Sequence, residues 1–330
     1  MKKIINQPET VVSYMLKGLA GSAPDRLAYS GEDTNVIYRA AKKQGKVGLV
    51  SGGGAGHEPA HAGYVGTGML DAAVSGNVFA SPGPDAIIEG IHRADSGAGV
   101  LMIIKNYSGD IMNFEMAGEM AEMDDIQTDY VVVKDDVAVP DSTYSTGRRG
   151  IAGTVFVHKI AGAAAEKGME LSEVKRVAQK TIDNVRSMGM AMTPCILPGV
   201  GKAGFELGER EIEIGMGIHG EPGVNREEIS DAATLAGKLV DRILLDFDFS
   251  GSEVAVMVNG LGGTPLMELY ILFHEVKQLL KEKNINIYRS LVGNYMTSLE
   301  MAGCSVTLLK LDDELKELLD APADTPALKC

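Results

Sequence analysis

The stretch VGLVSGGGAGHEP at residues 47–59 decides how the rest of this 330-residue chain is interpreted. An apolar run that is typical of a β-strand leads into four glycines within five positions, and His57 and an acid follow. Glycines after a strand let backbone N–H groups approach the oxygen atoms of a ligand, and the N-terminus of a following helix favours negative charge. Because a simple turn would need only one glycine, the stretch predicts a ligand-binding turn at the carboxyl end of a strand.

Short apolar runs alternate with longer amphipathic runs along the chain. The strand-like runs lie at residues 47–51, 100–105, 130–134, 212–218, 253–259 and 285–291. Apolar residues recur at helical spacing at residues 154–167, 172–188, 227–246 and 266–283. The alternation predicts an α/β fold of two domains, each a sheet flanked by helices.

The boundary between the two domains is expected where methionine, glycine and two prolines interrupt the helical pattern at residues 187–198. We therefore predict an N-terminal domain at residues 1–185, which carries the glycine-rich turn, and a C-terminal domain at residues 186–330. Ser172 is the expected N-cap of its helix. The tail at residues 321–327, rich in alanine, proline and aspartate, is expected to be a loose end.

Composition excludes several classes of protein. The formal net charge of −14 repels phosphate backbones and anionic lipid, so neither nucleic acid nor a membrane is an expected partner. Aromatic residues make up 5% of the chain and tryptophan is absent, which argues against stacking platforms for bases. The three cysteines form no CxxC pair, and the N-terminus lacks the apolar segment of a secretion signal. Both observations indicate a cytoplasmic protein.

Two further motifs place polar residues at the ends of predicted strands. In IIKNYSGD, residues 103–110, Lys105 and Asp110 follow an apolar strand, beyond whose carboxyl end the ligands of open α/β sheets bind. Asp110 has a second interpretation as a turn former or an N-cap. In IEIGMGIHGEPG, residues 212–223, His219 follows an alternating apolar run, and its HGEP setting echoes the GHEP setting of His57. The matched settings favour a chemical function for both histidines.

Two general motifs are excluded as the basis of function. HEPAH at residues 57–61 matches the zinc pattern H-E-x-x-H, but Pro59 and the preceding glycines prevent the continuous helix that such a site needs. We therefore expect no metal site. The P-loop pattern G-x-x-x-x-G-K-[ST] does not occur, so the chain does not bind a nucleotide in that way.

The remaining motifs have structural interpretations or stay open. Arg148 and Arg149, in STGRRGI at residues 145–151, either meet an anionic partner or are solvated in a loop. The methionines at positions 112, 116, 120 and 123 share one helical face, which predicts core packing. The histidines at positions 92, 158 and 274 are expected at the surface or in packing, and His61 stays ambiguous.

Four long motifs, in order and spread over nearly the whole chain, resemble one family. They are GGGAGHEPAHAGYVG at residues 52–66, IKNYSGDIMNFEMA at 104–117, DSTYSTGRRGIAGT at 141–154 and GMGIHGEPG at 215–223. The chain resembles the K subunits of dihydroxyacetone kinases, in the branch that depends on the phosphoenolpyruvate phosphotransferase system. The resemblance implies a kinase subunit that binds dihydroxyacetone.

The resemblance also implies functions for particular residues. His219 matches the histidine that adds through a ring nitrogen to the ketone carbonyl and gives a covalent hemiaminal. Asp110 matches the base that acts on the hydroxyl accepting phosphate, and His57 matches the histidine that hydrogen-bonds the substrate and assists transfer. The positions that match residues lining the substrate site are Gly54, Ala55, Gly56 and Lys105. The family commonly has serine where this chain has Ala55, so affinity should weaken if that hydroxyl matters.

The resemblance further implies partners, and it leaves alternatives open. No cofactor is expected on this chain: ADP or ATP and magnesium belong to an L subunit, which an M subunit recharges from phosphoenolpyruvate. A homodimer is implied as well. The sequence leaves open a K-like paralogue that acts as a ligand sensor or transcriptional coactivator. It also leaves open a kinase subunit for a related small ketose such as a tetrulose.

Overall fold

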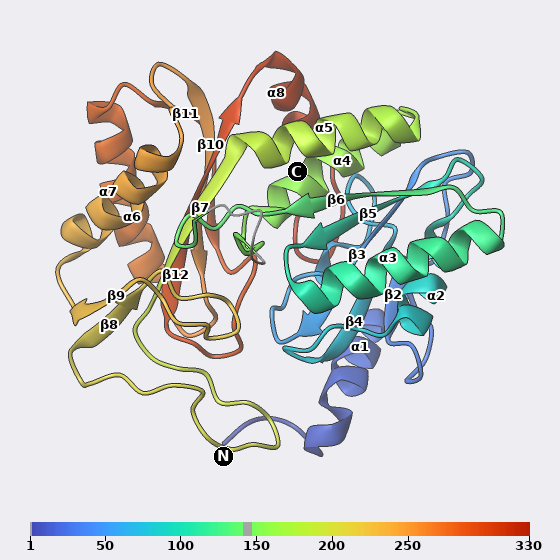
Figure 1. Ribbon diagram of the computed structural model, residues 1–330, viewed down its shortest axis with the longest axis horizontal. Helices are drawn as coiled ribbons and strands as arrows, with labels where there is room; N and C mark the ends of the chain where they lie inside the picture. The colour runs from blue at the N-terminus through green and yellow to red at the C-terminus, as the bar shows by residue number, and fades with distance from the viewer. Residues whose placement is uncertain (1, 141–146) are drawn as a thin grey trace. The chain divides into compact units, whose positions relative to one another are not determined.

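The computed structural model describes residues 2–140 and 147–330 (Figure 1). The described chain forms two compact units. Unit 1 consists of Met1–Val133, Val155–Thr181 and Leu315–Cys330, and unit 2 consists of Lys134–Thr154 and Ile182–Glu314. None of the helices in these described residues has the length and apolar character needed to cross a membrane.

Unit 1 is built on a six-stranded sheet of order β1-β2-β4-β3-β5-β6. Strands β4, β3, β5 and β6 run parallel, whereas β1 and β2 join the sheet antiparallel. The elements that lie wholly or mainly in unit 1 are η1 (Pro8–Thr10), α1 (Val11–Ser22), β1 (Leu27–Tyr29), β2 (Val36–Arg39), β3 (Gly48–Ala55), η2 (Ala62–Tyr64), β4 (Ala72–Val78), α2 (Pro84–Ala94), β5 (Val100–Lys105), α3 (Ser108–Met123), β6 (Thr128–Val133), α4 (Thr154–Glu166), α5 (Leu171–Asn184) and α8 (Asp313–Asp320).

Helices α2 and α3 pack against this sheet and bury its central strands. Ile87 and Ile91 of α2 and Phe114 of α3 form one core with Val74 of β4 and Met102 of β5. All five side chains are at most 1% exposed. Every residue of β3 is buried as well. Because β3 and β5 are parallel neighbours, their carboxyl ends meet at the same edge of the sheet, where ligands of α/β sheets bind.

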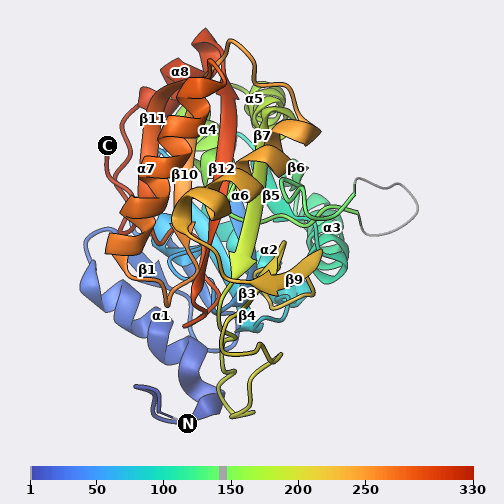
Figure 2. The same ribbon diagram turned by 90° about the vertical axis from the view of Figure 1, so that its left-hand side faces the viewer.

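Unit 2 is built on a second six-stranded sheet, of order β11-β10-β12-β7-β8-β9. Only β10 and β11 are parallel among its named strands. Figure 2 shows α6 and α7 in front of this sheet. The elements are β7 (Val185–Ala191), β8 (Glu211–Ile214), β9 (Asn225–Glu228), α6 (Ala232–Asp246), β10 (Glu253–Gly260), α7 (Leu266–Glu282), β11 (Asn286–Gly293) and β12 (Gly303–Leu311).

The predicted α/β fold with two sheets flanked by helices is confirmed. The strand predicted at residues 100–105 coincides with β5, and the four predicted helices correspond to α4–α7. Helix α6 begins later than predicted, because Asp231 caps it by accepting a hydrogen bond from the backbone N of Thr234 at 2.8 Å. Ser172 lies inside α5, so its prediction as the N-cap is wrong.

One predicted helix continues as a strand. Residues 172–188 were expected to be helical throughout, but α5 ends at Asn184 and Val185 begins β7. Strand β7 pairs with β12, which was not among the strands predicted from the sequence. Eight of the nine residues of β12 are buried. A strand covered on both faces has no polar alternation to distinguish it from other apolar runs.

Two segments belong to a different unit from the one expected from a division at residue 185. The segment Lys134–Thr154 joins unit 2, where the Asp135 carboxylate accepts hydrogen bonds from the backbone N of Ile151, the backbone N of Gly153 and the hydroxyl of Ser187. Contacts between residues so far apart leave no periodic pattern in the sequence, so a division based on periodicity does not detect them.

The C-terminal segment Leu315–Cys330 returns to unit 1, so the expectation of a loose tail is wrong. The backbone N of Asp324 donates to the carbonyl of Thr67 at 2.9 Å. Thr325 is fully buried, and Lys159 Nζ donates to the carbonyl of Leu318 at 2.8 Å.

The methionine face of α3 does not pack into the core as predicted. Met112, Met116 and Met123 are 60%, 48% and 78% exposed, and only Met120 packs against the core of the sheet. The buried face of α3 is instead centred on Phe114 and small residues. The prediction of core packing is therefore wrong for three of the four methionines.

Candidate functional site

Gly52, Gly53 and Gly54 lie within β3, so the prediction of a glycine-rich turn after the strand is wrong, because pairing with β4 continues through them. Two charged side chains lie together beside this carboxyl-terminal part of β3 in unit 1. An ideal Cβ placed on Gly53 would lie 3.2 Å from Nζ of Lys105 and 3.3 Å from Oδ2 of Asp110. Lys105 ends β5, Asp110 lies in the first turn of α3, and both are at most 3% exposed. The absence of a side chain at Gly53 leaves room for this buried ammonium and carboxylate beside the strand. The sequence motifs around residues 53 and 105 therefore meet in space.

Asp110 is neither a turn former nor the N-cap of its helix. The N-cap residue of α3 is Tyr107, and Asp110 lies three positions further on. The partial positive charge of the helix N-terminus favours its carboxylate. Its Oδ1 is buried and makes no hydrogen bond with any residue in the described part of the chain. A buried acceptor of this kind is suited to receive a hydrogen bond, or a proton, from a hydroxyl group of a ligand.

His57 is fixed by an aromatic ring from the loop after β4. Its imidazole is fully buried and stacks on Phe79, with 5.0 Å between ring centroids and 17° between ring planes. An ideal Cβ on Gly54 or on Gly56 would lie 2.7 Å from atoms of Phe79. Gly56 therefore leaves room for the ring that orients His57, and Gly54 leaves room for the backbone of Phe79. Ala55 is 4% exposed, and its carbonyl accepts a hydrogen bond from the backbone N of Phe79 at 2.9 Å.

A pair of buried histidines lies in the same unit, and the sequence did not predict it. Nδ1 of His61 and Nε2 of His158 are 3.0 Å apart, and the hydroxyl of Ser51 lies 3.3 Å from the same Nδ1. Burial lowers the pKa of His158 to about 3 and that of His61 well below its usual value, with Lys105 lowering both further. Both imidazoles are therefore neutral near pH 7 and share one proton between two nitrogens.

The zinc interpretation of HEPAH does not fit this geometry. Residues 57–61 form turns ahead of η2 rather than a helix, so His57 and His61 do not lie one above the other on a helical face. Within residues 2–140 and 147–330, no group of three or more histidine, cysteine or acidic side chains is placed to hold a metal ion.

His219 lies in unit 2, in the turn after β8. The strand predicted at residues 212–218 ends at Ile214, and the following turn brings Glu221 back onto the histidine. Nδ1 of His219 lies 2.8 Å from Oε1 of Glu221, and the backbone N of His219 donates to Oε2 at 2.9 Å. The side chain of His219 is 19% exposed. The sequence showed the HGEP echo but did not single out Glu221.

The two arginines of the GRRG motif have partners inside unit 2. Arg148 forms an ion pair with Asp246, and Arg149 donates from Nε to Asp136 at 2.8 Å. Arg149 also donates from Nη2 to the carbonyl of Gly215 at 2.8 Å. Neither arginine is simply solvated, and the anions that they meet belong to the protein itself. Ser145 and Thr146 of this motif, and residues 141–144 before them, lie outside the described residues.

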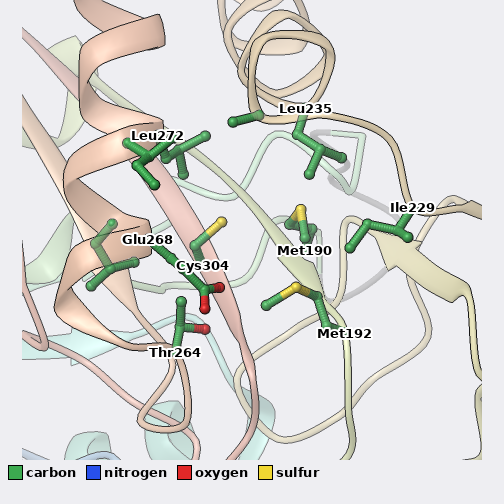
Figure 3. A pocket seen from close by; sticks show the side chains of 11 residues that line it. Met190, Met192, Ile229, Leu235, Thr264, Glu268, Leu272 and Cys304 are labelled. Carbon is green, nitrogen blue, oxygen red and sulfur yellow. The ribbon is translucent and has the colours of Figure 1, made fainter.

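Unit 2 also contains an apolar cavity of about 210 Å³ between α6, α7 and the sheet (Figure 3). Met190, Met192, Leu235 and Leu272 are among its lining residues. Of its polar lining groups, Thr264 already donates its hydroxyl proton to the carbonyl of Gly303 at 2.6 Å. An apolar wall of this kind does not satisfy the hydrogen bonds of a small polyhydroxylated ligand. The polar residues around Gly53 are the better candidates.

Comparisons with known proteins agree on one family. The Dak1 domain matches residues 17–327. The PTS-dependent dihydroxyacetone kinase 1, dihydroxyacetone-binding subunit DhaK, of Listeria innocua is 56% identical over 99% of this chain and 100% of its own length. The solved dihydroxyacetone kinase operon co-activator Dha-DhaQ superposes with a TM-score of 0.89 at 37% identity, covering 95% of this chain and 96% of its own.

A longer kinase is also similar. The dihydroxyacetone kinase from C. freundii, solved in complex with AMP-PNP and Mg2+, has a TM-score of 0.90 at 36% identity. The match covers 99% of this chain but 61% of that one.

Proposed function

The chain belongs to the Dak1 family, and from this membership we propose that it is the dihydroxyacetone-binding subunit of a phosphoenolpyruvate-dependent dihydroxyacetone kinase. The observation that carries the proposal is the buried carboxylate of Asp110, which shares the space beside Gly53 with the ammonium group of Lys105. A phosphoryl acceptor must lose a proton from its hydroxyl, and the buried Oδ1 of Asp110, which accepts no hydrogen bond within the described residues, supports this carboxylate as the acceptor of that proton.

His219 supplies the ketose-binding step of the proposal. Dihydroxyacetone has little apolar surface, so burial alone gives neither tight binding nor selectivity. A covalent hemiaminal on an imidazole nitrogen selects ketones over alcohols such as glycerol and fixes the carbon skeleton for transfer. The partial exposure of His219 agrees with a group that a small ketone reaches from solvent.

The phosphoryl group comes from a partner in this proposal. Asp110 accepts the proton of the attacking hydroxyl, His57 donates a hydrogen bond to the substrate, and Lys105 offsets the negative charge near the acceptor oxygen. ADP or ATP and magnesium are bound by an L subunit, which an M subunit recharges from phosphoenolpyruvate. The absence of a P-loop pattern supports this division. The proposal also includes a homodimer in the cytoplasm.

A second candidate function is that of a ligand-sensing coactivator, because the co-activator Dha-DhaQ is similar in structure over 95% of this chain. A sensor needs to hold its ligand but needs no base. The buried Asp110 therefore favours the kinase function.

The test combines ligand capture with turnover. Dihydroxyacetone labelled with ¹³C at the carbonyl is mixed with the wild type, His219→Ala and Asp110→Ala, and phosphorylation is measured with L, M and phosphoenolpyruvate. We expect a tetrahedral carbon signal in the wild type and in Asp110→Ala but not in His219→Ala. Turnover should fall by about 10²–10⁴-fold in Asp110→Ala.

Each other outcome has a defined meaning. Near-normal turnover of Asp110→Ala would show that the base is assigned wrongly. Capture without turnover in the wild type would favour the coactivator. A larger kcat/KM for erythrulose than for dihydroxyacetone would identify a subunit for a related ketose.

A further inference from the structure

Glu221 forms two hydrogen bonds with His219, one through each oxygen of its carboxylate. Oε1 lies 2.8 Å from the imidazole Nδ1, and Oε2 accepts a hydrogen bond from the backbone N–H of the same histidine at 2.9 Å. Two hydrogen bonds to one residue fix both the ring and the backbone that carries it. A carboxylate can serve both positions because each of its oxygens is an acceptor.

Arg149 lies near the Glu221 carboxylate, beside Gly217. An ideal Cβ on Gly217 would lie 2.1 Å from Oε2 of Glu221 and 2.6 Å from Nη1 of Arg149, so only glycine leaves room for both groups. Arg149 is itself fixed, because it donates to Asp136 and to the carbonyl of Gly215 at 2.8 Å each. A series of charged side chains, Asp136, Arg149 and Glu221, therefore leads to His219.

Glu221 is ionised under ordinary conditions. Burial alone would raise the pKa of its carboxyl, but the hydrogen bond to His219, the positive charge of that ring when it is protonated and the nearby Arg149 lower the pKa to about 2. An ionised carboxylate only accepts hydrogen bonds, so the nitrogen facing it must carry a proton. In the neutral imidazole, the proton is therefore on Nδ1 and the lone pair is on Nε2.

We propose that Glu221 is a positioning residue that holds His219 in the Nδ1–H tautomer, so that Nε2 presents its lone pair to the carbonyl carbon of the ketose. This inference rests on the proposed function and extends it from the histidine to the group that makes the histidine nucleophilic.

The capture step balances as follows. The Nε2 lone pair forms a bond to the carbonyl carbon, and the π bond of the carbonyl breaks toward oxygen. The oxygen takes one proton from solvent and becomes the hydroxyl of the hemiaminal. The imidazole, now substituted at Nε2 and still carrying its Nδ1 proton, is a cation. The Glu221 carboxylate neutralises that charge and stabilises the adduct.

Glutamine should be unable to replace Glu221. A side-chain amide has one acceptor oxygen and one NH2 donor, whereas both groups of His219 that face Glu221 are donors. If the amide oxygen accepts from the backbone N–H, the NH2 group faces Nδ1 and favours the tautomer with the proton on Nε2. That tautomer has no lone pair at the attacking nitrogen.

The test reads the tautomer and the adduct separately. ¹⁵N NMR of the histidine side chains, with the His219 signals assigned by comparison with His219→Ala, reports which nitrogen carries the proton. ¹³C NMR with carbonyl-labelled dihydroxyacetone reports the adduct. We expect the Nδ1–H tautomer in the wild type, and about 100-fold or greater loss of adduct affinity in Glu221→Gln with a shift toward the Nε2–H tautomer. Glu221→Asp keeps two acceptor oxygens and should restore the Nδ1–H tautomer.

Glu213→Gln is the matched control. Glu213 is a buried carboxylate of unit 2 that accepts from a backbone N–H of the same turn, that of Gly223, but its hydrogen bonds within the described residues do not include one to His219. It should leave the tautomer and the adduct unchanged.

Several results would overturn the proposal for Glu221. They are an Nε2–H tautomer in the wild type, an unchanged adduct in Glu221→Gln, or equal losses in the Glu213→Gln control. If Glu221→Gln fails to fold, the wild-type tautomer alone decides. A wild type with the Nδ1–H tautomer but no adduct would refute the proposed function and leave the assignment of Glu221 supported.

Discussion

Gly53 offers the sharpest test of the site in unit 1, because a single methyl group would enter the space between its two charged residues. In Gly53→Ala the new Cβ would lie 3.2 Å from Lys105 Nζ and 3.3 Å from Asp110 Oδ2. These distances are shorter than ordinary van der Waals contacts, so both groups must move by a few tenths of an ångström. The substitution therefore perturbs the geometry of the site without removing any of its functional groups.

Gly53→Ala is expected to lower both the stability and the turnover of the protein, for different reasons. Gly53 has a φ of +150°, a conformation that side chains other than glycine rarely adopt, and this strain should lower the free energy of unfolding by about 1–3 kcal/mol. The displacement of the ammonium and the carboxylate acts on turnover instead. Since a misplacement of about 1 Å can cost about 10²-fold in rate, a smaller shift should reduce kcat by roughly 10-fold or more.

Gly97→Ala separates the two effects. Gly97 also has a positive φ, +88°, but a Cβ there would have no atom within 4 Å. The free energy of unfolding of Gly97→Ala should fall by about as much as that of Gly53→Ala, while its turnover stays unchanged. The assay is phosphorylation of dihydroxyacetone with L, M and phosphoenolpyruvate, together with the thermal unfolding transition of each variant. Normal turnover of Gly53→Ala, or an equal loss in Gly97→Ala, would refute the idea that Lys105 and Asp110 act beside this glycine.

Two further predictions concern stability. Burial lowers the pKa of His158 to about 3, so between pH 6.5 and pH 3 this histidine is protonated in the unfolded chain but not in the folded one. Its contribution to stability is complete above the unfolded pKa near 6.5. The free energy of unfolding should therefore fall by about 2 kcal/mol between pH 7 and pH 5. Urea unfolding at both pH values should show a shallower pH dependence in His158→Gln than in the wild type, and identical pH dependences would contradict the assignment. Deletion of residues 321–330 removes buried Thr325 and the hydrogen bond from Asp324 to Thr67, and it should lower the unfolding temperature of the protein by several degrees. The exposed substitution Lys329→Ala is the control, and an unchanged transition after deletion would mean that the tail adds no stability.

The pattern of the sequence was sufficient to predict the fold class. Strand β5 was predicted at its observed residues, whereas the glycines predicted to form a turn after a strand lie within β3. Both predictions rest on local properties. Apolar periodicity depends on neighbouring residues, and a run of glycines constrains only its own backbone.

Elements that depend on distant partners were missed or assigned wrongly. Strand β7 was predicted as the end of a helix because its identity comes from pairing with β12, more than a hundred residues later. The exposed methionines of α3 and the buried tail show the same limit, since burial is decided by what packs against a segment. Periodicity identifies an apolar face but not the surface that covers it.

From the sequence by itself, His57, Lys105, Asp110 and His219 are predicted as the residues for chemistry, because each stands in a distinctive local setting at or after the end of a strand. Only the tertiary structure decided the orientation and the electrostatic surroundings of those groups. It placed Asp110 beside Lys105 at Gly53, set Phe79 against His57, and joined Arg149 to the turn that holds Glu221 on His219. Protonation states and orientations depend on charges and hydrogen bonds between residues that are distant in sequence, and these exist only once the chain has folded.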